Sequence, residues 1–167
     1  MLGESVIHTR KTLVRDVMTR RPITISPEAS VSSAVEVMRD RTIRHLPVVD
    51  GTGRLLGIVT DRDLRAAALS PALTEFLSVG LKRAVEGAAQ MLGELRVKDV
   101  MTWGVVTTRP DASVAEAGAV MFERRIGSLP VRDEGTLVGI VTERDIFKAL
   151  MMTITPVRGM DPDTYFW

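Results

Sequence analysis

Hydrophobic and polar positions recur in the same order in the two halves of the chain. Residues 31–38 carry apolar side chains at the spacing i, i+3, i+4, i+7, and residues 114–121 repeat that spacing with a glycine at one position. This periodicity predicts an amphipathic helix in each half. Ser30 and Ser113 stand directly before the two stripes. We predict that both are helix N-caps, because a serine oxygen accepts a hydrogen bond from the first helical turn.

Short β-branched runs and turn residues surround each predicted helix. A Leu-Pro-Val run follows it in both halves, and its proline suits the start of a strand or a sheet edge because proline donates no hydrogen bond. Each half therefore reads as β-α-β-β-α, an α+β (α/β) unit with a sheet covered by two helices. The predicted elements are 22–26, 31–38, 46–50, 54–60 and a helix starting at 64–69 in the first half, and 105–108, 114–121, 129–133, 136–142 and a helix starting at 146–151 in the second.

One stretch is repeated almost unchanged. Residues 57–63 read Gly-Ile-Val-Thr-Asp-Arg-Asp, and residues 139–145 read Gly-Ile-Val-Thr-Glu-Arg-Asp, 82 positions later (139 − 57). A repeat of this length that occurs twice indicates two copies of one folding unit rather than a solenoid. The predicted domains are a lead-in at 1–13, a first repeat at 14–70, a linker with a helix at 71–96, a second repeat at 97–152 and a tail at 153–167.

The segments outside the repeats carry signals of their own. The lead-in ends in Thr-Leu-Val at residues 12–14, which we expect to pack on the first repeat. Residues 81–95 have an apolar helical stripe that would cover apolar surface or form a dimer contact. The tail ends in Tyr165, Phe166 and Trp167, and such a cluster is expected to dock on a groove or a partner rather than stay in water.

The composition is that of an ordinary globular protein. The 167 residues are 45% hydrophobic and 26% charged, and 22 basic and 21 acidic residues are interspersed with a net charge of +1. This charge balance gives no electrostatic reason to expect binding to nucleic acid or to an anionic membrane. No apolar run approaches the roughly 20 residues of a membrane helix, and the N-terminus lacks a signal pattern. A chain without cysteine excludes disulfides, and two histidines exclude a His-rich metal site. We expect a cytoplasmic protein.

Three short motifs occur in the same order in each repeat: Val-Met-Thr, Leu-Pro-Val and Gly-Ile-Val-Thr-x-x-Asp. This ordered set resembles the CBS domain family, and the two copies resemble a free-standing CBS-domain pair, or Bateman module, over residues 14–70 and 97–152. The resemblance implies that the two units pack as a tandem pair with pseudo-two-fold symmetry and that two chains form a disc-shaped homodimer. It also implies that adenine nucleotides or related adenosyl compounds bind in clefts between the repeats.

The Thr-x-x-Asp end of the repeated stretch has two interpretations. Thr60 with Asp63, and Thr142 with Asp145, have the spacing of a helix capping box. The same geometry suits a nucleotide, because a helix N-terminus presents N–H groups to a phosphate and an aspartate accepts hydrogen bonds from ribose hydroxyls. The resemblance to nucleotide-binding CBS proteins implies phosphate and ribose contacts at these four residues, and both roles can coexist.

Basic residues near the motifs are candidate phosphate ligands. Arg44 and His45 directly precede the first Leu-Pro-Val strand, where the resemblance implies that basic residues reach phosphates, and an arginine fork suits a phosphate. The alternative is a solvated arginine and a partly buried histidine. Residues 127–128 read Gly-Ser at the matching place, so the two clefts should differ. Arg62 and Arg144 inside the motif would reach phosphates or a dimer partner, or lie on the surface.

An adenine ring needs apolar walls with one or two backbone hydrogen bonds. Candidates for these walls are Ile23 and Pro47 in the first repeat, and Val105 and Pro130 in the second. The alternative for the two aliphatic residues is a place in the hydrophobic core.

Catalytic motifs are absent from the sequence. The patterns Gly-x-x-x-x-Gly-Lys-Ser/Thr, Gly-x-Ser-x-Gly and His-Glu-x-x-His do not occur, so we predict no enzyme, no catalytic residue and no metal ligand. The leading hypothesis is a regulatory sensor that binds AMP, ADP or ATP, with NAD-type or S-adenosyl compounds as alternatives. It would pass its state to an unknown effector protein or to its own oligomer. The competing hypothesis is a ligand-free interaction module that acts through dimerisation and its tail.

Overall fold

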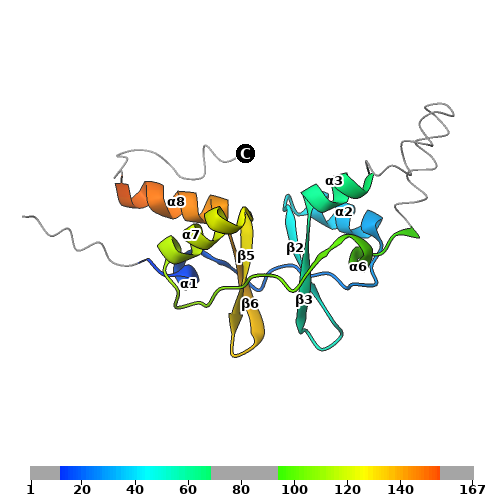
Figure 1. Cartoon of the computed structure of the whole chain (residues 1–167), viewed down its shortest axis with the longest axis horizontal. Helices are drawn as coiled ribbons and strands as arrows, with labels where there is room; N and C mark the ends of the chain where they lie inside the picture. Colours follow the sequence, from blue (N-terminus) through cyan, green and yellow to red (C-terminus); the bar gives the residue numbers. More distant parts are fainter. Residues whose placement is uncertain (1–11, 69–93, 155–167) are drawn as a thin grey trace, which may run out of the picture.

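The computed structural model describes residues 12–68 and 94–154, arranged as two halves that stand side by side (Figure 1). Each half has a β-hairpin with helices packed on it. The predicted tail, nearly all of the linker helix and most of the lead-in lie outside the described residues. The first half contains α1 (Val14–Val17), β1 (Thr19–Arg20), α2 (Val31–Asp40), β2 (His45–Val49), β3 (Leu55–Thr60) and α3 (Asp61–Ala68). The second half contains α6 (Val97–Val100), β4 (Thr102–Trp103), α7 (Val114–Arg124), β5 (Ser128–Asp133), β6 (Thr136–Thr142) and α8 (Glu143–Ile154).

The two halves exchange their first strands. β1 pairs antiparallel with β6 of the second half, with Thr19 opposite Ile140. β4 pairs in the same way with β3 of the first half, with Thr102 opposite Ile58. The two sheets therefore have the strand orders β1-β6-β5 and β2-β3-β4, and each contains strands from both repeats. Because the hydrogen bonds of each short strand run to the other half, the two units are interlocked.

The prediction of strands at 22–26 and 105–108 is wrong. In the first of these segments a single residue, Ile25, forms an isolated parallel bridge with Val48, and the second segment forms the matching bridge. Ile25 N–H donates to the Pro47 carbonyl at 3.0 Å. One residue of each segment reaches the sheet edge, so no ladder propagates, and the true first strands lie just upstream in the Val-Met-Thr region.

The residues that lead into the first repeat pack on the second half, contrary to the prediction. Val14 N–H donates to the Ala112 carbonyl at 2.9 Å, and Leu13 bridges Ser113. The Val14 side chain is fully buried in the core of the second half, where α1 lies beside α7 (Figure 1). The reason is that α1 continues directly into the exchanged strand β1. In the same way α6 precedes β4 and buries Val97 in the core of the first half.

The two amphipathic helices and their serine caps are confirmed. Ser30 Oγ accepts a hydrogen bond from Ser33 N–H at the start of α2, and Ser113 Oγ accepts one from Glu116 N–H at the start of α7, both at 3.1 Å. Each helix buries its first, fourth and eighth residues against the hairpin of its half. Val35, which belongs to the predicted stripe of α2, is instead 42% exposed.

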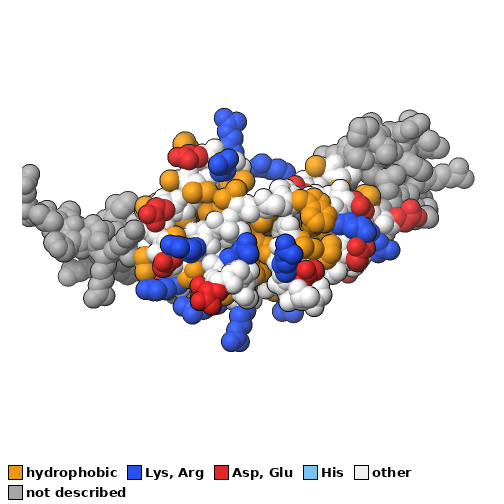
Figure 2. All heavy atoms as spheres, turned by 60° about the horizontal axis from the view of Figure 1, so that its bottom comes forward, with side chains coloured by type: hydrophobic (Ala, Val, Ile, Leu, Met, Phe, Trp, Pro, Cys, Tyr) orange, Lys and Arg blue, Asp and Glu red, His pale blue; other side chains and the backbone are white. Residues whose placement is uncertain are grey.

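The outer surface mixes charge and hydrophobic atoms. On the face drawn in Figure 2, basic and acidic side chains are interspersed over both halves with hydrophobic side chains between them. This distribution agrees with the nearly balanced charge of the sequence. Among the described residues, no helix combines the length and the apolar character needed to cross a bilayer.

Gly57 should be required for β4 to reach the first half. A Cβ at Gly57 would collide with the Thr102 carbonyl oxygen and would lie 3.2 Å from the methyl carbon of Met101. Gly57→Ala should therefore displace β4 and lower the free energy of unfolding by about 1–3 kcal/mol, the usual cost of overpacking, measured by urea denaturation. Gly51→Ala is the control, because nothing lies within 4 Å of its Cβ position. Equal stability of the two variants would contradict a structural role of this pairing.

Candidate functional site

Two clefts of similar size lie between the halves. Cleft 1, of about 550 Å³, opens at the N-terminus of α8, and cleft 2, of about 530 Å³, opens at the N-terminus of α3. Each cleft is lined by residues of both repeats. The reason is that the segment after each exchanged strand lies on the other half of the molecule. Of the predicted site residues, cleft 1 is lined by Ile23, Arg44, His45, Thr142, Arg144 and Asp145. Cleft 2 is lined by Arg44, His45, Thr60, Arg62, Asp63, Val105 and Pro130.

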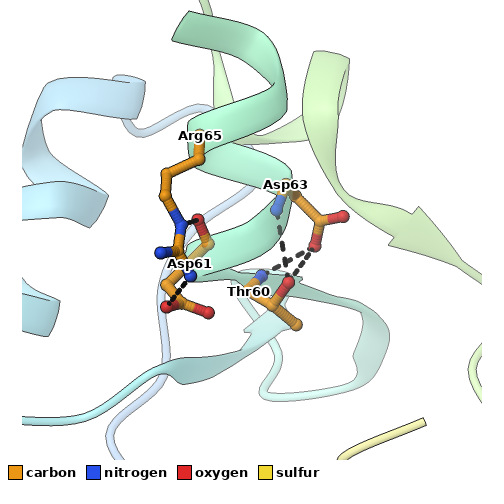
Figure 3. A network of polar contacts seen from close by, with 4 residues as sticks. All are labelled: Thr60, Asp61, Asp63 and Arg65. Atoms are coloured by element: carbon orange, nitrogen blue, oxygen red, sulfur yellow. Dashed lines mark hydrogen bonds and ion pairs between the residues drawn. The ribbon is translucent and has the colours of Figure 1, made fainter. Parts of the chain in front are cut away.

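Thr60 and Asp63 form a closed capping box at the start of α3 (Figure 3). Asp63 Oδ2 accepts hydrogen bonds from Thr60 N–H at 2.8 Å and from Thr60 Oγ1–H at 2.7 Å, and Asp63 N–H donates to Thr60 Oγ1 at 3.3 Å. This arrangement confirms the capping interpretation. It also explains why α3 begins at Asp61, three residues before the predicted start.

The second copy of the motif has the same geometry. Asp145 Oδ2 accepts hydrogen bonds from Thr142 N–H and from its hydroxyl group, both at 2.8 Å, and Asp145 N–H donates to Thr142 Oγ1 at 3.4 Å. In both boxes the threonine hydroxyl already donates to the aspartate, so it would have to turn before it could donate to a phosphate. In the first box, the Oδ1 oxygen of Asp63 points away from Thr60 (Figure 3). This oxygen takes no part in the capping box, and Asp63 lines cleft 2.

Arg44 and His45 line both clefts and so form a wall that the clefts share. A Cβ at Gly127, on the opposite half, would lie 3.4 Å from His45 Nε2 and 3.6 Å from Glu143 Oε2. Gly127 therefore lies in van der Waals range of both the imidazole and the carboxylate. Burial lowers the pKa of His45 from its ordinary value of 6.5, and the charge of Arg44 adds to this effect. The nearby carboxylates, with Asp61 the strongest, oppose the shift.

The four candidates for an adenine wall lie in different surroundings. Ile23 is 40% exposed and lines cleft 1, while Val105 and Pro130 line cleft 2. Pro47 is fully buried in β2 opposite Ile58, and it lines neither cleft. Pro130 is as fully buried as Pro47, so the two prolines differ only in that Pro130 borders a cleft.

Several cleft residues were missed in the sequence. Arg21 and Lys148 line cleft 1, Arg125 lines cleft 2, and Glu143 lines both. Arg21 directly follows β1, so its place in the cleft depends on the strand exchange, which leaves no local signal. Glu143 stands inside the repeated stretch and could have been found there. Among the residues of 12–68 and 94–154, no group of three or more histidine, aspartate or glutamate side chains is placed to hold a metal ion.

The CBS domain model matches residues 14–70 and 97–152. The chain therefore belongs to the CBS domain family and carries two copies of the domain. A CBS domain-containing protein of Dictyostelium discoideum is 35% identical over 148 residues, which are 88% of this chain and 97% of that protein. The pair also occurs inside longer enzymes: inosine-5'-monophosphate dehydrogenase of Methanocaldococcus jannaschii is 37% identical over 134 residues, 80% of this chain and 22% of the enzyme.

Solved structures of CBS pairs have the same fold. CBSX2 of Arabidopsis thaliana, solved in complex with AMP, has a TM-score of 0.66 and 28% identity over 84% of this chain and 97% of that chain. The CBS domain pair of protein MJ0100, solved with 5'-methylthioadenosine and S-adenosyl-L-methionine, has a TM-score of 0.64 and 29% identity over 83% and 95% of the two chains. Both of these CBS proteins were thus solved with ligands that contain an adenosine unit.

His45 should make stability depend on pH between neutral and mildly acidic conditions. Its pKa is lowered in the folded state, so below pH 6.5 the unfolded chain takes up a proton before the folded chain does. The contribution of neutral His45 to the free energy of unfolding is fully present above pH 6.5. It is lost as the pH falls toward the folded-state pKa. Urea denaturation from pH 7.5 to pH 5 should therefore show a steeper loss of stability for the wild type than for His45→Gln, with His8 present in both. Parallel curves would contradict this role of His45.

Proposed function

We propose that this chain is a cytoplasmic regulatory sensor that binds an adenine nucleotide or a related adenosyl ligand between its two CBS repeats. The observation that carries the proposal is the composition of the clefts. Each joins the N-terminus of a helix and its capping aspartate with arginines drawn from both halves. A helix N-terminus and arginine forks suit phosphate groups. The ligands of CBSX2 and MJ0100 support the adenosyl class.

The ligand would contact three kinds of group in each cleft. In cleft 1 the adenine would lie against Ile23 and Ile140, the ribose hydroxyls would bind the Asp145 carboxylate, and the phosphates would meet Arg44 and the start of α8. Cleft 2 offers the matching set around Asp63 and Val105. No reaction is proposed, since the role of these groups is to bind and orient. The chain would act through an effector protein.

A bound ligand would signal by holding the halves in one arrangement. Each cleft takes residues from both repeats, so the ligand bridges them. It shifts the equilibrium between arrangements by its differential affinity for them. A partner that contacts both halves would then distinguish the occupied from the empty module.

Substitution of the capping aspartates tests this function. Asp63→Ala and Asp145→Ala should each weaken binding in one cleft by about tenfold or more, because a charge-assisted hydrogen bond contributes about 1.5–3 kcal/mol. Calorimetric titration with AMP, ATP, NADH and S-adenosylmethionine measures the effect. Asp99→Ala is a matched control: Asp99 Oδ2 caps α6 by accepting from Arg96 N–H at 2.8 Å, outside both clefts. If none of the four ligands binds the wild type, the ligand-free interaction module replaces the sensor.

We also propose that the chain forms a homodimer through α7 and α8. Phe122 on α7 is 85% exposed and Phe147 on α8 is 58% exposed, and Leu150 and Met151, which follow Phe147 on α8, are also exposed. At the positions that match Phe122 and Phe147 by the repeat offsets, the first half carries Arg39 and Arg65. An apolar face is best buried against another apolar face. The second halves of two chains would therefore meet.

A charge on this face should break the dimer. Phe122→Glu should convert the protein to a monomer in size-exclusion chromatography with light scattering, because the carboxylate would have to be buried without a partner. Arg39→Glu, at the matching position of α2, is the control and should leave the dimer intact. A wild type that is monomeric at all concentrations, or a dimer that survives Phe122→Glu and dissociates with Arg39→Glu, would contradict the proposed face.

A further inference from the structure

We infer that Arg21 makes cleft 1 a polyphosphate-binding cleft, so that it prefers a nucleoside triphosphate to a monophosphate. The nucleotide part of this inference rests on the proposed function. The repeat offset of 83 or 82 residues maps most lining residues of one cleft onto lining residues of the other, so the two clefts can be compared position by position.

The backbone at Arg21 has an unusual conformation for an arginine. Its φ is 48°, in the left-handed region that disfavours side chains with a Cβ. The matching residue of the second repeat is Gly104, with a φ of 61°, and glycine adopts this region without strain. Both residues follow an exchanged strand, and both line a cleft. The turn therefore requires a left-handed residue, and in cleft 1 the chain places a cation there despite the strain.

A second cation distinguishes cleft 1. Lys148 on α8 lines it, and the matching residue of α3 is Ala66. Among the described residues, no ion pair involves Arg21 or Lys148. Arg21 and Lys148 are thus available to an anionic ligand in cleft 1. In cleft 2, Arg65 is held by an ion pair with Asp61 (Figure 3), while Arg62 and Arg125 take part in none of the ion pairs of the described residues.

Each cleft has four cationic side chains, and the formal charges differ because Asp61 adds a third carboxylate to cleft 2. Cleft 1 has a net charge of +2, from Arg21, Arg44, Arg144 and Lys148 against Glu143 and Asp145. Cleft 2 has a net charge of +1, from Arg44, Arg62, Arg65 and Arg125 against Asp61, Asp63 and Glu143. Each phosphate that is added to a nucleotide adds negative charge, so the more positive cleft gains more from a longer phosphate chain.

The test is to exchange Arg21 for the residue of the other repeat. Arg21→Gly and Lys148→Ala are titrated calorimetrically with AMP, ATP and inorganic tripolyphosphate in magnesium-free buffer. Arg21→Gly should weaken ATP and tripolyphosphate by about tenfold and AMP by less than about threefold, and Lys148→Ala should act in the same direction. The fold should survive, because glycine relieves the left-handed backbone.

Two controls separate charge from strain. Glu134→Gly also replaces a left-handed residue (φ 45°) by glycine, in a turn outside the clefts, and it should leave all three affinities unchanged. Arg20→Ala removes the neighbouring cation, which lines neither cleft. An Arg20→Ala effect as large as that of Arg21→Gly would overturn the inference, since it would indicate a general effect of net charge.

The remaining outcomes separate this inference from the proposed function. Equal losses for AMP and ATP in Arg21→Gly, or no loss for either, would overturn the inference and leave nucleotide binding in place. Tripolyphosphate binding that requires Arg21, without binding of any nucleotide, would support the inference about the cleft and overturn the sensor. If the wild type binds neither nucleotides nor tripolyphosphate, both fail.

Discussion

The architecture depends on two very short strands that cross between the halves. β1 and β4 each contribute two residues to the sheet of the other repeat, and the chain that follows each strand is delivered to the far side of the molecule. Arg21 and Ile23 reach the start of α8 for this reason, as Val105 reaches the start of α3. The clefts are thus shared structures. Neither repeat forms a complete cleft of its own, because each cleft takes residues from both.

The sequence predicted the elements whose signals are local. The caps at Ser30 and Ser113, the two amphipathic helices and the paired hairpin strands follow from spacing within a few residues. The pairing of β1 and β4 could not be found in this way, because two exposed residues show no periodicity. The predicted strands at 22–26 and 105–108 failed because β-branched residues also suit an extended segment that touches a sheet at one residue.

The residues of the candidate site also differ in whether a local sequence signal predicts them. Thr60 and Asp63 belong to a compact motif, so their cap could be predicted from spacing, while their place at a cleft was predicted from the family resemblance. Arg21 belongs to no sequence motif. It was identified from its left-handed backbone angle and from the glycine, Gly104, at the matching position of the second repeat. Pro47 has the same local sequence as Pro130, yet only the latter lines a cleft.

The strand exchange also gives the two sheets pairings of very different sequence separation. Ile58 and Thr102, which join β3 to β4, are 44 residues apart (102 − 58), whereas Thr19 and Ile140, which join β1 to β6, are 121 apart (140 − 19). Loop-closure entropy makes the longer connection about 0.9 kcal/mol more costly to close. During synthesis β3 and β4 also emerge well before β6. The first sheet can therefore be completed while β1 still has no partner, whereas both clefts need Gly127 and Glu143 of the second half.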